Sequence, residues 1–289
     1  MNNGGDDART AYPCVLTEAM WQVVSAHLPV RDRSRGGRPL KYDHRLVIDT
    51  ILYVLVSGCA WRLVPHDLAP WDAAYRRFRL WSATGVWDDI HHALREQVRH
   101  AQGRNTEPTA AVLDSQTTHS ACGGEQIGYD AGKKTRGRKR HLLVDTLGLL
   151  LICVVHSASV QDRAGAKLVL CSITDEHPDL GLIWVDGGYV NSVDAGLVDW
   201  ADQELGIRLE VVKRNDDVKG FHVLPRRWVV ERTLGWLTHC RRLCRDYERT
   251  IAHAEDFIKL AMIRLMAARL TGQQTRYRNI RPTTADNEP

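Results

Sequence analysis

The sequence contains few cysteines, and their arrangement excludes the common cysteine-based sites. Its 289 residues include 7 cysteines, an odd number scattered along the chain, and none stands in a Cys-x-x-Cys pair. Cys240 and Cys244 are four residues apart in a predicted helix, but no His or Cys pair accompanies them, so we do not expect a zinc site. The cysteines are expected to be reduced thiols with a structural role.

Long apolar runs are also absent. The longest uncharged apolar run covers residues 147–155, far below the roughly 20 residues of a membrane helix. The first residues include Asp6 and Asp7 and no apolar stretch, which does not fit a signal peptide. We also find no internal repeat and no extended low-complexity segment. The sequence therefore predicts a cytoplasmic protein that has no membrane partner.

A strong net charge is lacking, but basic residues are concentrated locally. The chain has 39 basic and 35 acidic residues, a net charge of +4, which mildly favours a polyanionic partner. Residues 31–41 form an arginine-rich linker, which is either a solvated loop or a contact to the DNA backbone. Residues 133–141 hold six cations in nine positions, and such a block typically contacts phosphates.

Changes in composition divide the chain into four parts. Residues 1–15 are predicted to be a disordered tail, 16–102 a helical DNA-binding domain, 103–271 an α/β catalytic domain and 272–289 a polar tail. The segment 102–108 marks the boundary between the two domains, because the apolar periodicity changes there from helical to strand-like.

The first domain is predicted to be entirely helical. Helices are expected over residues 18–28, 43–58, 71–82 and 87–100, with Thr17 capping the first and Gly58 ending the second. In the third helix Arg76, Arg77 and Arg79 would face outward. Short helices that present clustered arginines resemble a helix-turn-helix unit, and the alternative is a helical domain with a merely soluble face.

Three acidic residues stand out in the second domain. Asp114 follows the apolar run 110–113, Asp186 follows a second apolar run, and Glu231 lies on a predicted helix over residues 228–247. Each Asp is expected to end a buried strand at the rim of the sheet. A single acid in that position is usually a cap or a solvated residue, and Asp145 and Asp162 are taken to be of this kind.

The order of elements in the second domain indicates its fold. Strands are predicted at 111–114, 141–145 and 149–156, followed by a helix at 163–173, a strand at 182–186, a helix at 192–200, a strand at 208–212 and the long helix. Three strands in a meander followed by alternating helices and strands predict an α/β mixed sheet flanked by helices, which is the RNase H-like order.

The three acids suit metal-assisted phosphoryl transfer. Mg²⁺ prefers oxygen ligands and keeps bound waters, and two metal ions can stabilise both the attacking and the leaving oxygen at phosphorus. We therefore expect Asp114, Asp186 and Glu231 to converge. In the last helix Arg227 precedes Glu231 by four residues, and this pair could also be a simple surface salt bridge.

The cations between the first two strands are predicted to form a flexible loop that contacts the DNA backbone. The residues in question are Lys133, Lys134, Arg136, Arg138, Lys139 and Arg140.

Several long motifs make a family resemblance specific. The segments VLDSQ, GKKTRGRKRHLLVDTLGLLL, VQDRAGAKLVL, WVDGGY and LPRRWVVERTLGWLTHCRRLCRDYE resemble DDE transposases of bacterial insertion sequences. Within these, the chain is similar to the insertion-sequence-five group of the insertion-sequence-four-like superfamily. LTEAMWQVVSAHLP, GRPLKYDHRLVIDTILYVLVSGCAWRLVP and WDAAYRRFRLWSATGVWDDI resemble the helical domain of that group. The match runs from about residue 16 to 270.

The resemblance implies a function and a site. The catalytic and metal-binding residues would be Asp114, Asp186 and Glu231, holding Mg²⁺ or Mn²⁺, with two ions expected. The partner would be DNA, both element ends and target, bound by a homodimer associated with the nucleoid. The expected reaction is cut-and-paste transposition. The alternatives are an RNase H-like nuclease without strand transfer and a non-catalytic DNA-binding protein derived from a transposase.

The resemblance also implies a signature of Tyr, Arg, Glu and Lys around the last acid. Arg227 and Glu231 fit it, whereas Leu224 stands at the Tyr position and Thr238 at the Lys position. Arg241 and Arg242 are the candidates to replace the missing phosphate contacts. Two further residues of this segment, Trp228 and Trp236, are either packing residues or platforms for a flipped base.

Overall fold

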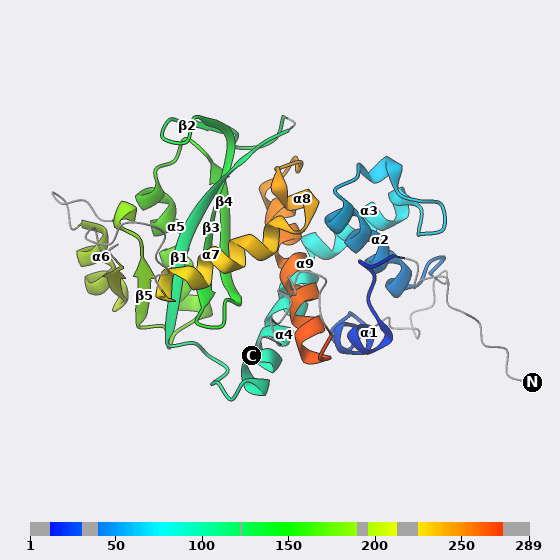
Figure 1. Cartoon of the computed structure of the whole chain (residues 1–289), viewed down its shortest axis with the longest axis horizontal. Coiled ribbons are helices and arrows are strands. Elements are labelled where there is room, and N and C mark those ends of the chain that lie inside the picture. Colours follow the sequence, from blue (N-terminus) through cyan, green and yellow to red (C-terminus); the bar gives the residue numbers. More distant parts are fainter. Residues whose placement is uncertain (1–11, 31–39, 122, 190–195, 213–224, 274–289) are drawn as a thin grey trace, which may run out of the picture.

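The computed structural model describes residues 12–30, 40–121, 123–189, 196–212 and 225–273. Most of the two predicted tails, most of the arginine-rich segment 31–41, and Leu224 lie outside these residues. The described chain forms a sheet with helices on both faces, next to a group of helices built mainly from the N-terminal third (Figure 1). No helix in the described ranges is both long and apolar enough to cross a membrane.

The sheet is mixed, as the sequence predicts. Its strands are β1 (Ala110–His119), β2 (Gly128–Asp130), β3 (Thr135–Asp145), β4 (Leu150–Ser157), β5 (Leu182–Val185) and β6 (Arg208–Val211). β3 pairs antiparallel with β1, β2 and β4, whereas β5 pairs parallel with both β1 and β6. An antiparallel meander extended by parallel strands confirms the expected mixed α/β class.

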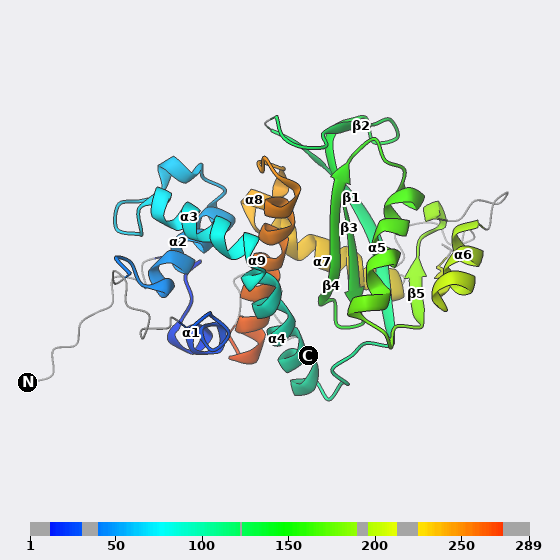
Figure 2. The same ribbon diagram turned by 180° about the vertical axis from the view of Figure 1, so that it is seen from behind.

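Helices cover the two faces of the sheet and form the neighbouring group. They are α1 (Glu18–Ser25), α2 (His44–Ser57), α3 (Trp71–Ala83), α4 (Val86–Ala101), α5 (Asp162–Glu176), α6 (Gly196–Leu205), α7 (Pro225–Thr238), α8 (Arg241–Cys244) and α9 (Ile251–Leu270). α7 crosses one face of the sheet, and α5 and α6 lie on the other (Figures 1 and 2).

Local capping fixes several helix ends in the way the sequence predicts. The Thr17 hydroxyl accepts a hydrogen bond from the Met20 backbone N–H, and Asp43 caps α2 in the same manner through Leu46. Gly58 ends α2 with a φ of 72°, a left-handed conformation that favours glycine. The first helix stops at Ser25, three residues before the predicted end.

Helix α9 has no counterpart among the elements predicted from the sequence. This helix is buried along most of its length, through Phe257, Ile258, Met262 and Met266 among others. It packs against α4 and against β4, so it lies between the N-terminal helices and the sheet (Figure 2). One continuous apolar core therefore joins the N-terminal helices, α9, α7 and one face of the sheet.

The predicted single helix over residues 228–247 is wrong. α7 ends at Thr238, and Cys240 adopts an extended conformation before the short α8 begins. The C-terminal end of α2 packs directly on α8, because a Cβ atom at Gly58 would lie 2.9 Å from the Cβ of Arg241. This tertiary contact redirects the chain, so residues beyond Thr238 do not continue the face of the helix that carries Glu231.

Candidate active site

Asp114 and Asp186 lie on neighbouring parallel strands at the same level. Val112 of β1 pairs with Trp184 of β5, and both acids come two residues later. Neighbouring strands are about 4.8 Å apart, so the register sets the two residues side by side. The expectation that Asp114 ends its strand is wrong, because β1 continues to His119 alongside β3. Asp114 instead lies where the parallel neighbour β5 stops.

Both acids are on the face of the sheet that α7 covers. Side chains alternate along a strand, so Asp114 shares a face with Val112. Val112 belongs to the core that contains Val230 and Leu234 of α7. On the other strand, the backbone N–H of Gly188 donates a 2.8 Å hydrogen bond to the Asp186 carboxylate and so helps to fix its direction.

Arg227 and Glu231 of α7 complete the group. One guanidinium nitrogen of Arg227 lies 3.8 Å from an Asp186 oxygen and 3.4 Å from a Glu231 oxygen, so the two acids contact the same cation. The predicted Arg227–Glu231 pair is thus present, but it is shared with Asp186. Glu231 itself is exposed.

Asp114 is electrostatically coupled to the same group. Burial, and to a smaller degree the negative charges of Asp186 and Glu231, raise the pKa of Asp114 to about 6. A hydrogen bond from the Ser115 backbone N–H and the charge of Arg227 act in the opposite direction. Two strands and one helix therefore bring together three acids that lie far apart in the sequence.

The donor set of these acids fits a hard divalent cation. Carboxylate oxygens are the ligands that Mg²⁺ and Mn²⁺ prefer, and a cation would offset both the burial and the smaller repulsion that raise the pKa of Asp114. As the side chains stand, no group of three His, Cys, Asp or Glu residues within the described ranges is arranged to hold an ion. Arg227 occupies the position between two of the acids.

The predicted flexible basic loop is wrong for its second half. Residues 135–145 form strand β3, and Arg138, Lys139 and Arg140 are only 2%, 4% and 6% exposed. Arg138 donates to Asp246 and to three backbone carbonyls. Arg140 donates to the Gln116 side chain on the same face as Asp114. Because these cations have internal partners, they are not a surface that could follow DNA phosphates.

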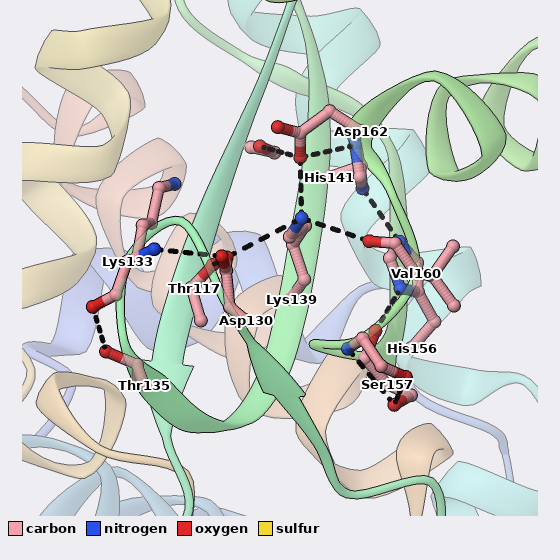
Figure 3. Close-up of polar contacts among 12 residues, drawn as sticks. Thr117, Asp130, Lys133, Thr135, Lys139, His141, His156, Ser157, Val160 and Asp162 are labelled. Atoms are coloured by element: carbon pink, nitrogen blue, oxygen red, sulfur yellow. Dashed lines mark hydrogen bonds and ion pairs between the residues drawn. The ribbon is translucent and has the colours of Figure 1, made fainter.

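Lys139 lies at the centre of a polar cluster (Figure 3). The cluster is on the opposite face of the sheet from Asp114, because Lys139 pairs with Thr117 and side chains alternate along β1. Its ammonium group is 2.9 Å from an Asp162 oxygen and 3.6 Å from an Asp130 oxygen, and it donates to the carbonyl of Val160. Burying this cation is tolerated because two carboxylates and a carbonyl surround it. In contrast, Lys133, Lys134 and Arg136 are exposed and remain available to a ligand.

Asp145 and Asp162, which are expected to be ordinary rim residues, both have internal partners. Asp145 is fully buried, forms an ion pair with Arg99 and accepts hydrogen bonds from the backbone N–H groups of Leu147 and Leu149. Asp162 starts α5 and pairs with Lys139. Neither partner could be identified from local sequence, because each lies tens of residues away.

Two of the three arginines of α3 are exposed as the sequence predicts. Phe78 and Trp81 are buried, whereas Arg76 and Arg79 are exposed and Arg77 is half-buried against the ring of Trp81. Arg76 is ion-paired with Asp72 at 2.8 Å on the surface. The outer face of α3 can therefore contact a ligand, and the inner face holds the helix in position.

The substitutes proposed for the missing signature residues differ in exposure. Arg242 is buried, donates to Glu248 at 2.7 Å and to the carbonyl of Cys59, and so is not free to bind phosphate. Arg241 and Thr238 are exposed. Trp228 is 39% exposed and carries the Arg232 guanidinium over its ring.

Trp236 is the second aromatic residue of this segment, and its surroundings favour packing. Its indole is half-buried, and the guanidinium groups of Arg232 and Arg269 lie 4.8 and 4.6 Å from the ring centre. The ring is thus already covered by cations, as expected for cation–π packing.

Comparisons with known proteins identify the family of the chain. Residues 105–266, more than half of the chain, match the family model described as "Transposase DDE domain". The chain belongs to the DDE transposase family. Residues 16–91 match a second model, described as "Putative transposase of IS4/5 family". DDE transposases are polynucleotidyl transferases, act on DNA and generally use divalent metal ions, and their catalytic domain is RNase H-like.

Two relatives from Burkholderia cepacia belong to one insertion element. The "Insertion element IS402 uncharacterized 16.2 kDa protein" is 28% identical over 118 residues, which cover 39% of this chain and 79% of that protein. The "Putative transposase for insertion sequence element IS402" is 30% identical over 131 residues, which cover 43% of this chain and 60% of that protein. These partial matches support the family assignment and leave the site residues of this chain to be tested directly.

Proposed function

We propose that this chain catalyses cut-and-paste transposition of its own insertion sequence. It would bind the terminal inverted repeats, hydrolyse the phosphodiester backbone at the element ends and join the 3′-OH to target DNA. The observation that carries the proposal is the meeting of Asp114, Asp186 and Glu231 on one face of the sheet, where burial and mutual repulsion raise the pKa of Asp114. Neighbouring carboxylates disfavour one another's charged form, and a cation bound between them favours it.

These three acids are the proposed ligands of two Mg²⁺ or Mn²⁺ ions. When bound, such ions activate a water or hydroxyl nucleophile and stabilise the charge on the leaving oxygen. The strands hold Asp114 and Asp186 side by side, and α7 supplies Glu231 from above the sheet. Arg227 contacts both Asp186 and Glu231, so it can neutralise them in the free protein.

The proposed DNA surface has two parts. The helical segment 16–102 would read the element ends through Arg76, Arg77 and Arg79 on α3. The exposed Lys133 and Lys134 in the turn between β2 and β3, together with the exposed Arg136 at the start of β3, would hold the backbone. Among the other candidates, the exposed Arg241 remains available. We propose that a homodimer binds the two element ends, in the cytoplasm and on the nucleoid.

Single substitutions of the acids test the proposal. Asp114→Asn, Asp186→Asn and Glu231→Gln should each abolish cleavage of element-end DNA in Mg²⁺ or Mn²⁺ while DNA binding remains, because a ligand charge is lost and distant phosphate contacts are not. Asp199→Asn, an exposed acid of α6 on the opposite side of the sheet, is the matched control. Full metal-dependent cleavage by any of the three purified variants would contradict the assignment.

Two other functions make different predictions in the same assay. A related nuclease would cut the element ends but would not join them to a target plasmid. A non-catalytic DNA-binding protein would retard the DNA without cutting it in any divalent metal. A strand-transfer assay that contains element ends and a supercoiled target therefore separates all three.

A further inference from the structure

Ser115 connects the two faces of the sheet at the candidate active site. Its backbone N–H donates a 2.7 Å hydrogen bond to the Asp114 carboxylate. Its side chain points to the opposite face, because side chains alternate along β1, and there the hydroxyl donates a 2.9 Å hydrogen bond to Asp162. Any rotation of the strand at Ser115 would therefore break one of these bonds and redirect Asp114.

Asp162 is itself firmly held. One of its oxygens accepts from both the Ser115 hydroxyl and the Lys139 ammonium group, each at 2.9 Å. Lys139 is 4% exposed and is fixed in turn by Asp130 and by the carbonyl of Val160 (Figure 3). Burial would raise the pKa of Asp162, but the hydrogen bonds from Lys139 and Ser115 outweigh it and keep the pKa below its ordinary value. The carboxylate thus stays charged and remains a strong acceptor.

We propose that Ser115 and Asp162 are positioning residues. They hold the Asp114 carboxylate in the direction of Asp186 and Glu231, on the other face of the sheet. The proposal rests on the proposed function, because it takes Asp114 to be a metal ligand. Neither residue contacts the reacting atoms. Their contribution is to hold one ligand in the direction in which it meets Asp186, as outer hydrogen bonds commonly do for metal ligands.

The same cluster offers a matched control. Thr117 lies two residues further along β1, on the same face as Ser115, and its hydroxyl donates a 2.6 Å hydrogen bond to Asp130. Asp130 contacts the same Lys139 ammonium group as Asp162 does. Ser115→Ala therefore removes the hydroxyl that donates to Asp162, and Thr117→Val removes the hydroxyl that donates to Asp130 in the same cluster. Only Ser115 is adjacent to Asp114.

The test is a Mn²⁺ titration of the purified full-length chain, followed by the electron paramagnetic resonance of free Mn²⁺. Ser115→Ala should raise the Mn²⁺ dissociation constant on the order of tenfold, the lower end of the loss typical for outer-shell contacts. Ser115→Thr keeps the hydroxyl and should bind nearly as the unchanged protein does. Thr117→Val should leave the constant unchanged, although thermal unfolding in EDTA should show that both hydroxyl deletions destabilise the fold to a similar degree.

Asp162→Asn tests the same contact from the acceptor side and keeps the size of the side chain. It keeps an oxygen that can accept from Ser115 but loses the charge that pairs with Lys139, so Mn²⁺ binding should again weaken. Equal weakening by Ser115→Ala and Thr117→Val, or no weakening by Ser115→Ala and Asp162→Asn, would overturn the positioning role while leaving the metal site in place. Mn²⁺ binding that survives Asp114→Asn unchanged would instead overturn the proposed metal site, and the positioning role with it.

Discussion

The raised pKa of Asp114 predicts that this residue lowers the stability of the metal-free protein. Its carboxylate is partly buried, faces two other acids and is charged at neutral pH. Asp114→Asn removes the charge and keeps both the size of the side chain and an oxygen that can accept the hydrogen bond from Ser115. The variant should therefore be inactive yet more stable than the unchanged chain at neutral pH.

The size and the pH range of the effect follow from the two pKa values. The pKa is 3.8 in an ordinary setting and about 6 in the folded chain. A difference of about 2 units corresponds to roughly 3 kcal/mol, at 1.36 kcal/mol per unit. The folded state binds the Asp114 proton more tightly than the unfolded state does, so protonation of Asp114 stabilises the fold. This stabilisation is fully present below about pH 4 and is lost as the pH rises through about 6. The gain from Asp114→Asn should thus be near zero at pH 4 and up to roughly 3 kcal/mol at pH 7.

Urea denaturation of both proteins at several pH values in EDTA measures this difference. Other titrating groups cancel, because they are common to the two chains. Added Mn²⁺ should stabilise only the unchanged protein and so reduce the difference. A stability difference that does not vary between pH 4 and pH 7, or a variant that is less stable at pH 7, would refute the reasoning.

Three further predictions concern the core and the DNA surface. Asp145→Ala should lower the free energy of unfolding by about 3–5 kcal/mol in urea denaturation at pH 7, because Arg99 is left buried without its carboxylate, and a loss below 1 kcal/mol would contradict this. The double replacement of Lys133 and Lys134 by Ala should weaken binding to element-end and random DNA alike. In fluorescence anisotropy at several salt concentrations, the slope of the logarithm of the binding constant against the logarithm of the salt concentration should become shallower by about one per lost contact. Arg76→Ala should instead reduce the preference for element ends over random DNA by about 1–3 kcal/mol in competition binding, and an equal loss for both DNAs would count against base reading by α3.

Features that depend on neighbours in the sequence could be predicted from the sequence. The caps at Thr17 and Asp43 and the stop at Gly58 are local hydrogen-bonding and backbone preferences, and the structure has all three. The mixed class of the sheet follows from the order of apolar segments. The prominence of Asp114 and Asp186 could also be read from the sequence, because each follows a short apolar run.

Features that depend on distant partners could not be predicted in this way. Arg138 and Lys139 look like surface cations by composition, yet the partners that allow their burial, Asp246 and Asp162, lie far along the chain. The length of β1 beyond Asp114 likewise depends on its pairing with β3. α9 was missed because it is buried on nearly every side, so it lacks the polar face that makes a helical period visible.

The buried cations Arg138, Lys139 and Arg140 help to explain how the sheet can hold a group of acids that repel one another. Burial of the Asp114 carboxylate near two other acids opposes folding, so the strand that carries Asp114 must be stabilised by other contacts. β3 pairs with β1 from Ala111 to His119. The buried Arg138, Lys139 and Arg140 lie in the part of β3 that pairs with residues 116–118 of β1, just beyond Asp114. Each of these side chains ties β3 to a different partner, so the strand pair is rigid next to the acids. The buried half of the basic block therefore belongs to the architecture of the site, and only its exposed members, Lys133, Lys134 and Arg136, remain for the proposed contact with DNA.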